Sequence, residues 1–91
     1  MVSNRIKDRF LTEKRMMDEV FNKINIAIDD IGSQQFLEMA RNYYKDSSYF
    51  FDKKDYIRAF EAIVISWAYV DAGIKIGFFS LPESLRNYFT S

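Results

Sequence analysis

The side chains of this sequence that could do chemistry are carboxylates, tyrosines and lysines, because the chain contains no cysteine and no histidine. Histidine is the commonest general base and metal ligand, and cysteine supplies thiol catalysis and disulfide bonds. The acids that stand out are Asp46, Glu61 and Asp71, and Lys75 follows Asp71 by one helical turn. An active site would have to be built from these residues and the tyrosines.

Asp46 and Glu61 are expected to lie level with each other across a helical hairpin. Two facing carboxylates can share a proton or bind a divalent cation through their oxygens. Pairing along the hairpin edge with Arg58 or Lys45 explains these acids equally well. Because histidine is missing and no cleft is evident, we predict that the protein is not an enzyme and has neither a metal site nor a cofactor. A carboxylate-based site for a metal or a small ligand is the least favoured alternative.

Asp71 lies within an otherwise apolar stretch, YVDAGIKIGFF, residues 69–79. A buried carboxylate needs hydrogen-bond partners, and the expected register puts Asp71 level with Phe36, in the first turn of the second helix. That turn offers unpaired backbone N–H groups and a partial positive charge. The sequence therefore predicts that Asp71 tethers the third helix to the start of the second. A small-ligand site lined by Asp71 and Lys75 is the alternative.

Gly73 and Gly77 are four residues apart, which puts them on nearly one face of the third helix. Because they lack side chains, they let another helix or the C-terminal tail approach closely. They do not form a phosphate-binding loop, since they follow a helix rather than a strand and no GxGxxG or P-loop pattern is present. Their spacing therefore predicts close packing.

The elements that must position these residues are helices, because apolar residues recur at steps of three, four and seven. The predicted helices cover about 3–31, 33–51 and 54–77, with a short tail helix at about 81–89. Gly32 is expected to end the first helix and Ser33 to cap the second. Since short connections make neighbouring helices antiparallel, we predict a single all-α domain, 1–91, without strands. Its architecture would be an up-down-up three-helix bundle with a short C-terminal helical appendage, and the largely apolar third helix would be the central one.

Aromatic residues make up 18% of the chain, and the net charge is zero. Large rings can fill a small core, or they can anchor an interface, where tyrosine and tryptophan are enriched. The rings considered for an interface are Tyr43, Tyr44, Tyr49, Trp67, Tyr69, Tyr88 and Phe89. Together with few charges in residues 61–91, they predict an interaction module that binds a protein partner or forms a homodimer. The alternative is that these rings are core or ordinary surface residues.

Other partners and settings are less favoured by the charge pattern. Basic residues of the first helix are interleaved with acids, so a nucleic-acid-associated role is the weaker alternative. The segment 62–81 has the length of a membrane span but contains Asp71 and Lys75, so we expect no membrane insertion. Without cysteine and without a signal peptide, the protein is expected in the cytoplasm.

The second hairpin carries the pattern of a known family. The residues concerned are Tyr44, Asp46, Phe50, Asp55-Tyr56, Ala59-Phe60-Glu61-Ala62-Ile63, Asp71-Ala72-Gly73 and Gly77. Over about residues 40–79 the pattern resembles DUF357, a family of small archaeal proteins of unknown function. The resemblance implies a short three-helix bundle and an archaeal, cytosolic setting, and it implies no activity. Lys54 departs from the pattern, because the family tends to have glycine before this aspartate and lysine is costly in a left-handed turn.

Overall fold

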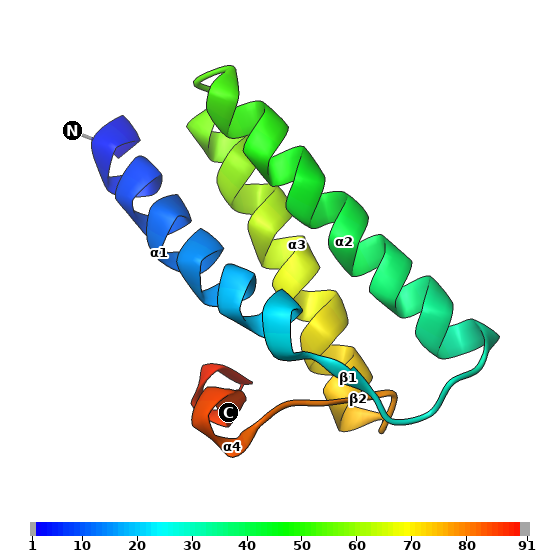
Figure 1. Ribbon diagram of the computed structural model, residues 1–91. Helices are drawn as coiled ribbons and strands as arrows, with labels where there is room; N and C mark the ends of the chain where they lie inside the picture. Colours follow the sequence, from blue (N-terminus) through cyan, green and yellow to red (C-terminus); the bar gives the residue numbers. More distant parts are fainter. Residues whose placement is uncertain (1, 90–91) are drawn as a thin grey trace.

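Helices dominate the described part of the chain in the computed structural model (Figure 1). The structure describes residues 2–89, with side chains from residue 5 onward. The elements in order are α1 (Val2–Lys23), β1 (Asn25–Ile26), α2 (Ile31–Asp52), α3 (Tyr56–Lys75), β2 (Phe79–Ser80), α4 (Glu83–Arg86) and a 3₁₀ turn (Asn87–Phe89). Residues 1, 90 and 91 of the predicted domain lie outside the described residues. The predicted all-α class is confirmed.

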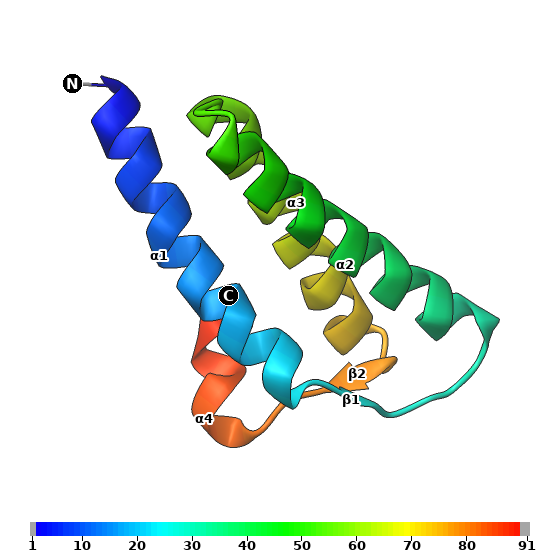
Figure 2. The same cartoon turned by 45° about the horizontal axis from the view of Figure 1, so that its top comes forward.

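The helix α3 lies between α1 and α2 and packs against both (Figures 1 and 2). Near the start of α1, the rings of Phe10 and Phe51 stack with centroids 4.9 Å apart. Nearer its end, the ring of Phe21 meets Tyr44 edge-on, also at 4.9 Å. Because residue numbers rise along α1 while those of its partners fall, α1 is antiparallel to α2 and parallel to α3. The predicted up-down-up order is confirmed.

Small residues bring α2 and α3 close together. Ala40, Ala59 and Ser66 are completely buried, and the Ser66 hydroxyl donates a hydrogen bond to the carbonyl of Ala40 at 2.6 Å. Short side chains at these positions allow the two helices to approach. The larger core side chains come mainly from α1, α3 and the tail: Phe10, Met17, Val20, Ile63, Val70, Leu81, Leu85 and Phe89.

The first connection differs from the prediction. The helix α1 ends at Lys23 rather than near residue 31, and the chain continues as β1, which pairs antiparallel with β2. Beyond β1, the N–H of Ala27 donates to the carbonyl of Phe78 at 2.8 Å. The helical spacing of isoleucines continues through this segment, but its backbone bonds to a distant part of the chain instead of to itself. The prediction of a helix over 3–31 and of no strands is therefore wrong.

The start of α2 also differs. Asp30 is the N-cap, and its carboxylate accepts the N–H of Ser33 at 2.9 Å while the N–H of Asp30 donates to the Ser33 hydroxyl at 3.0 Å. This reciprocal arrangement is a capping box. Ser33 is thus the third residue of α2 and not its N-cap, and Gly32 lies inside the first turn instead of ending α1. The charged side chain of Asp30 is the stronger acceptor for the N–H groups at this helix end.

The C-terminal ends of α2 and α3 share one geometry. In α2, the N–H of Asp55 donates to the carbonyl of Phe50, and the N–H of Lys54 donates within the last turn, both at 2.9 Å. In α3 the corresponding donors are Phe78 and Gly77, at 2.8 and 3.1 Å. This pair of bonds defines the Schellman motif, whose closing residue is left-handed. Accordingly, Lys54 has φ of 62° and Gly77 has φ of 89°.

The tail folds back against the lower ends of α1 and α3 (Figure 1). Gly73 makes room for it, since a Cβ at this position would lie 2.3 Å from the ring of Phe79. The predicted close approach is confirmed at Gly73, whereas Gly77 serves the turn that ends α3 two residues earlier than predicted. The tail is also less regular than the predicted helix over 81–89, because only α4 is α-helical and the 3₁₀ turn follows it.

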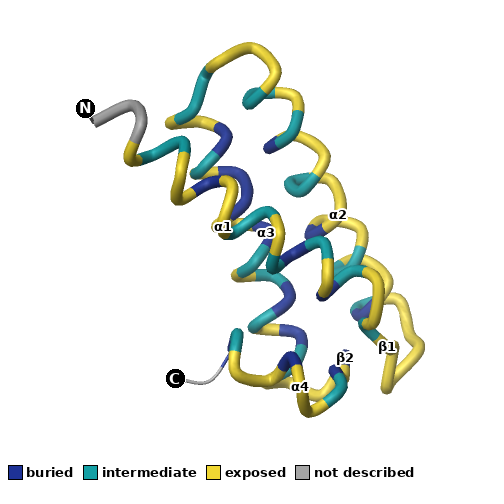
Figure 3. Tube along the Cα trace, turned by 60° about the vertical axis from the view of Figure 1, so that its left-hand side comes forward, coloured by how far each residue is buried: buried dark blue, intermediate teal, exposed yellow. Residues whose placement is uncertain are grey.

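Exposure is unevenly distributed along the chain (Figure 3). Residues 25–31, which lead from β1 into α2, are exposed throughout, whereas the tail has buried side chains at regular intervals. Among the described helices, none combines the length and the apolar character needed to cross a membrane.

Candidate functional site

Asp46 and Glu61 both lie on the exposed surface, on α2 and α3 respectively. Arg58, a possible partner, instead forms an ion pair with Asp55 at 3.6 Å. The carboxylate of Asp55 also caps α3, because it accepts the N–H of Arg58 at 3.2 Å. Within the residues whose side chains are described, no group of three or more acids could hold a metal ion. The geometry of these acids therefore adds no support for a metal site.

Asp71 lies at the predicted height but has a different partner. Two residues earlier, the ring of Tyr69 meets Phe36 edge-on at 5.7 Å, so this part of α3 is beside the first turns of α2. The Asp71 carboxylate, however, forms an ion pair with Lys75 at 2.9 Å, and its Oδ1 atom is buried without a hydrogen-bond partner. Because Asp30 already caps α2, the predicted tether is wrong. Asp71 and Lys75 form an ion pair of the kind common between successive helical turns.

Tyr44 belongs to a polar cluster that joins α2 to α1. Its hydroxyl donates to the carboxylate of Asp18, and Lys14 donates to Asp18 at 3.2 Å and to Tyr44 at 3.4 Å. Burial, followed by the hydrogen bond to Asp18, raises the pKa of Tyr44 above its ordinary value. Burial by itself lowers the pKa of Lys14, but the hydrogen bond and the negative charge of Asp18 outweigh it, so the pKa is raised. The cluster thus holds a neutral phenol and a charged amine, which is a structural tie and not an activated nucleophile.

Three of the candidate interface rings hold the tail on the bundle. Trp67 stacks on Phe89 with centroids 5.4 Å apart, and its Nε1–H donates to the carbonyl of Tyr88 at 3.3 Å. The hydroxyl of Tyr88 donates to Glu19 of α1 at 3.1 Å, and this hydrogen bond raises the pKa of Tyr88. These rings therefore make internal contacts. Of the others, Tyr43 stacks on Tyr69, and Tyr49 is exposed.

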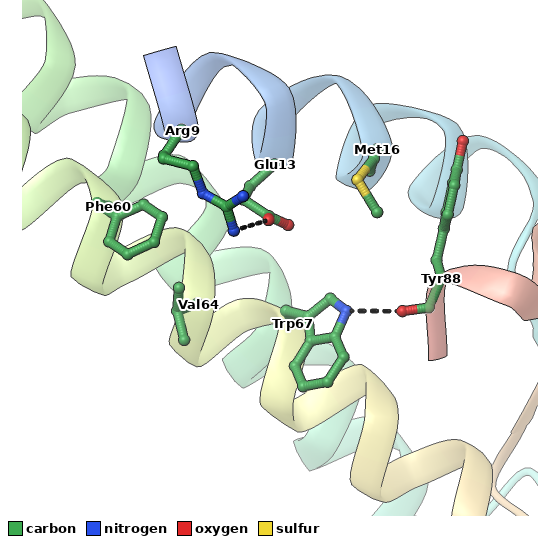
Figure 4. A pocket seen from close by; sticks show the side chains of 7 residues that line it. All are labelled: Arg9, Glu13, Met16, Phe60, Val64, Trp67 and Tyr88. Carbon is green, nitrogen blue, oxygen red and sulfur yellow. Dashed lines mark hydrogen bonds and ion pairs between the residues drawn. The ribbon is translucent and has the colours of Figure 1, made fainter. Parts of the chain in front are cut away.

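A shallow groove runs between α1 and α3 beside the tail (Figure 4). Its volume is about 280 Å³, and it is lined by Arg9, Glu13, Met16, Phe60, Val64, Trp67 and Tyr88. On the α1 side, Arg9 and Glu13 form an ion pair at 3.3 Å, as Figure 4 shows, so the charges at the rim balance. The rest of the lining is largely apolar.

Beside this groove, α3 presents a row of apolar side chains to solvent. We call this row the exposed α3 face, and its members are Ile57, Val64, Ile65, Ala68, Ala72 and Ile76. The exposed fractions of its large side chains are 61% for Ile57, 54% for Ile76, 41% for Val64 and 38% for Ile65. At 3.6 residues per turn, separations of three, four and seven residues return to nearly the same side of a helix, and adjacent Val64 and Ile65 border that side, so the row lies along one side of the helix. Glu61 and Lys75 lie on the same side.

The exposed α3 face was not predicted from the sequence, because a largely apolar helix was expected to be buried. The helix is central and packs against α1 and α2, but these two neighbours leave Ile57, Val64 and Ile65 exposed. The signal was nevertheless present in the sequence. A helix that is apolar around most of its circumference, in a bundle with only two other long helices, must leave part of its apolar surface uncovered.

Comparison with known proteins decides the family. A family model described as "Protein of unknown function (DUF357)" matches residues 13–79, which is most of the chain. The chain belongs to the DUF357 family. This DUF357 protein is also similar to a solved structure, protein AF1782 from Archaeoglobus fulgidus, which matches the same family model. The two are 27% identical, with a TM-score of 0.73, over 90% of this chain and 100% of the other. A search of curated proteins finds no match.

The motif residues that carried the resemblance have structural tasks in this DUF357 protein. Asp55 caps α3, Gly73 admits the ring of Phe79, and Gly77 closes the turn after α3. These three motif residues therefore describe how the α2–α3 hairpin and the tail fit together.

Proposed function

We propose that this DUF357 protein is a non-catalytic interaction module that binds a protein partner through the exposed α3 face. The observation that carries the proposal is the exposure of three large aliphatic side chains along one side of a regular helix and of a fourth, Ile76, at its C-cap. Contiguous apolar patches on monomers are often functional, and burying them against a partner contributes about 25 cal/mol per Å². A helix is also a rigid support, so little conformational entropy is lost when it docks.

The exposed α3 face is a better candidate than the other exposed isoleucines. Ile26, Ile28 and Ile31 surround β1 and the connection that leads into α2. These side chains belong to three different segments, since Ile26 ends β1, Ile28 lies in the connection and Ile31 begins α2, and the charged Asp29 and Asp30 lie between them. A partner would have to order this segment and desolvate its acids, whereas the side chains of α3 are already aligned.

Contacts on α1 favour a protein partner over a nucleic acid. Arg9 pairs with Glu13 at 3.3 Å and Lys14 pairs with Asp18 at 3.2 Å, so acids on the same helix already neutralise these cations. Phosphate backbones are bound by cations whose charge is available. The proposed setting is the cytoplasm of an archaeon, which the archaeal origin of protein AF1782 and the cysteine-free sequence support.

The test is affinity capture from an extract of the source organism, with and without nuclease, using two matched variants. Val64→Glu puts a charge on the exposed α3 face, and Asn42→Glu puts the same side chain on an exposed position of α2. We expect a protein in stoichiometric amount that survives nuclease, is retained by wild type and by Asn42→Glu, and is lost with Val64→Glu.

Two results would contradict the proposal. Equal retention of the captured protein by both variants would show that the exposed α3 face does not bind it. Loss of the captured material on nuclease treatment would indicate a nucleic-acid-associated role instead. Circular dichroism of both variants must first show wild-type helicity, so that loss of binding is not loss of fold.

A further inference from the structure

We infer that the exposed α3 face binds a second copy of this chain, with the two α3 helices antiparallel about a two-fold axis that passes beside Ala68. This inference rests on the proposed function, because it names the partner of the same surface. Two-fold dimers are the commonest homo-oligomers, and their interfaces must be self-complementary. The exposed α3 face meets that requirement in both charge and size.

Two opposite charges on this side of α3, those of Glu61 and Lys75, are placed symmetrically about Ala68. Glu61 and Lys75 are each seven residues from it, on opposite sides, which corresponds to about 10 Å along the helix. An antiparallel pair centred on Ala68 therefore brings Glu61 of each copy level with Lys75 of the other, and forms two intermolecular ion pairs. A parallel pair would instead oppose like charges. Lys75 can keep its bond to Asp71 at 2.9 Å, because an ammonium group has several N–H donors.

The sizes of the side chains are also complementary in this arrangement. Ala68 meets Ala68 at the axis, where the two helices are nearest, and its small side chain lets the backbones approach. On one side of the axis, the large Val64 lies level with the small Ala72 of the other copy, because each is four residues from Ala68, and the reverse holds on the other side. Alternation of large and small side chains is what allows two helix surfaces to interdigitate.

The small area of the exposed α3 face indicates a weak interface. From Ile57 to Ile76 it extends about 28 Å at 1.5 Å per residue, and a helix presents a strip about 10 Å wide. The resulting patch of about 300 Å² is well below the roughly 800 Å² that each partner buries in an interface of standard size. We therefore expect a reversible dimer with a Kd in the micromolar range, and not an obligate one.

Cysteine cross-linking tests the arrangement directly, because the chain has no cysteine of its own. Ala68→Cys places a single thiol beside the proposed axis, facing its own copy. Ala72→Cys places the thiol four residues further along the same face, so that the two thiols of an antiparallel dimer are about 12 Å apart along the helices. A disulfide requires Cα atoms within about 7 Å. At micromolar concentrations and under mild oxidation, we expect Ala68→Cys to form covalent dimers at least tenfold faster than Ala72→Cys.

Charge reversal provides a second test that does not depend on thiol geometry. Glu61→Lys and Lys75→Glu each place two like-charge pairs in the homodimer, so each variant should be monomeric by light scattering. Mixing the two variants creates a heterodimer in which both pairs are attractive again, and dimers should reappear. Melting curves of the separate variants confirm that each is folded.

The outcomes separate this inference from the proposed function. Equal cross-linking at the two cysteine positions, or no recovery of dimers on mixing, would overturn the antiparallel arrangement. A wild-type protein that stays monomeric at about 100 μM, well above the expected Kd, would overturn the second copy as partner. In that case the proposed function still stands if Val64→Glu, and not Asn42→Glu, abolishes capture of a different protein.

Discussion

Lys54 adopts a left-handed backbone conformation, with φ of 62°, at the position that closes the Schellman motif after α2. For an L-residue this conformation costs about 1–2 kcal/mol, whereas glycine adopts it without that cost. Glycine in turn loses about 0.5–1 kcal/mol more in backbone entropy on folding. The Lys54 side chain is exposed, so its removal sacrifices little packing. We therefore expect Lys54→Gly to increase the free energy of unfolding by about 0.5–1 kcal/mol.

Urea and thermal unfolding followed by circular dichroism measure this change. For a domain of this size, an increase of about 0.5–1 kcal/mol corresponds to a rise in Tm of about 2–8 °C. The matched control is Lys53→Gly, which removes the same charge from the neighbouring residue. Lys53 has φ of −83°, an ordinary value, so glycine there relieves no strain and should lower stability. The reasoning is refuted if Lys54→Gly fails to raise the midpoint, or if Lys53→Gly raises it equally.

Further substitutions test the other contacts. Gly73→Ala places a methyl group against the ring of Phe79, at 2.3 Å before relaxation. It should lower the free energy of unfolding by about 2 kcal/mol in urea titrations. An unchanged urea midpoint would show that the tail is not packed against Gly73. Asp30→Ala should lower the free energy of unfolding by about 1 kcal/mol, because the capping box is lost, while Asp71→Asn should leave α2 intact. A larger loss of stability for Asp71→Asn than for Asp30→Ala would show that Asp71 tethers α3 to the start of α2. The pKa of Tyr44 is raised in the folded state above its ordinary value of 10.0. The stability that Tyr44 contributes is therefore fully present at pH values below its ordinary pKa, and it is lost as the pH rises through the folded-state pKa. Tyr44→Phe should therefore flatten the fall in stability above about pH 10, and a profile identical to wild type would exclude this role.

Local patterns in the sequence were sufficient for the helices and their order. The repeat of apolar residues predicts each of the long helices, and the short hairpin turn makes α2 and α3 antiparallel. Gly73 was expected to allow a close approach, and the ring of Phe79 occupies that space. The motif around Asp55 and Gly73 also predicted the family, which the match over residues 13–79 confirms. These features depend on neighbours within a few residues or on one turn, so they can be recognised without a structure.

The end of α1 could not be recognised in this way. The apolar spacing continues through Ile24, Ile28 and Ile31, and a local analysis extends the helix accordingly. The segment leaves the helix because its backbone bonds to β2 and to Phe78, which are more than fifty residues away in the sequence. Ser33 was predicted to cap α2, but Asp30 is the N-cap and Ser33 is the third residue of the helix and its partner in the capping box.

What the sequence by itself determined is therefore the helical character of the chain, its family and the tightness of the contact at Gly73. Tertiary structure alone decided which apolar side chains reach the core. Trp67 and Val64 are three residues apart on α3, yet Trp67 packs on the tail and Val64 borders solvent. The physical reason is that periodicity shows how apolar residues are distributed around a helix, whereas burial depends on how many neighbours surround that helix. With α1 and α2 on two sides of α3, one apolar side is left largely uncovered by the described helices, and that side is the exposed α3 face.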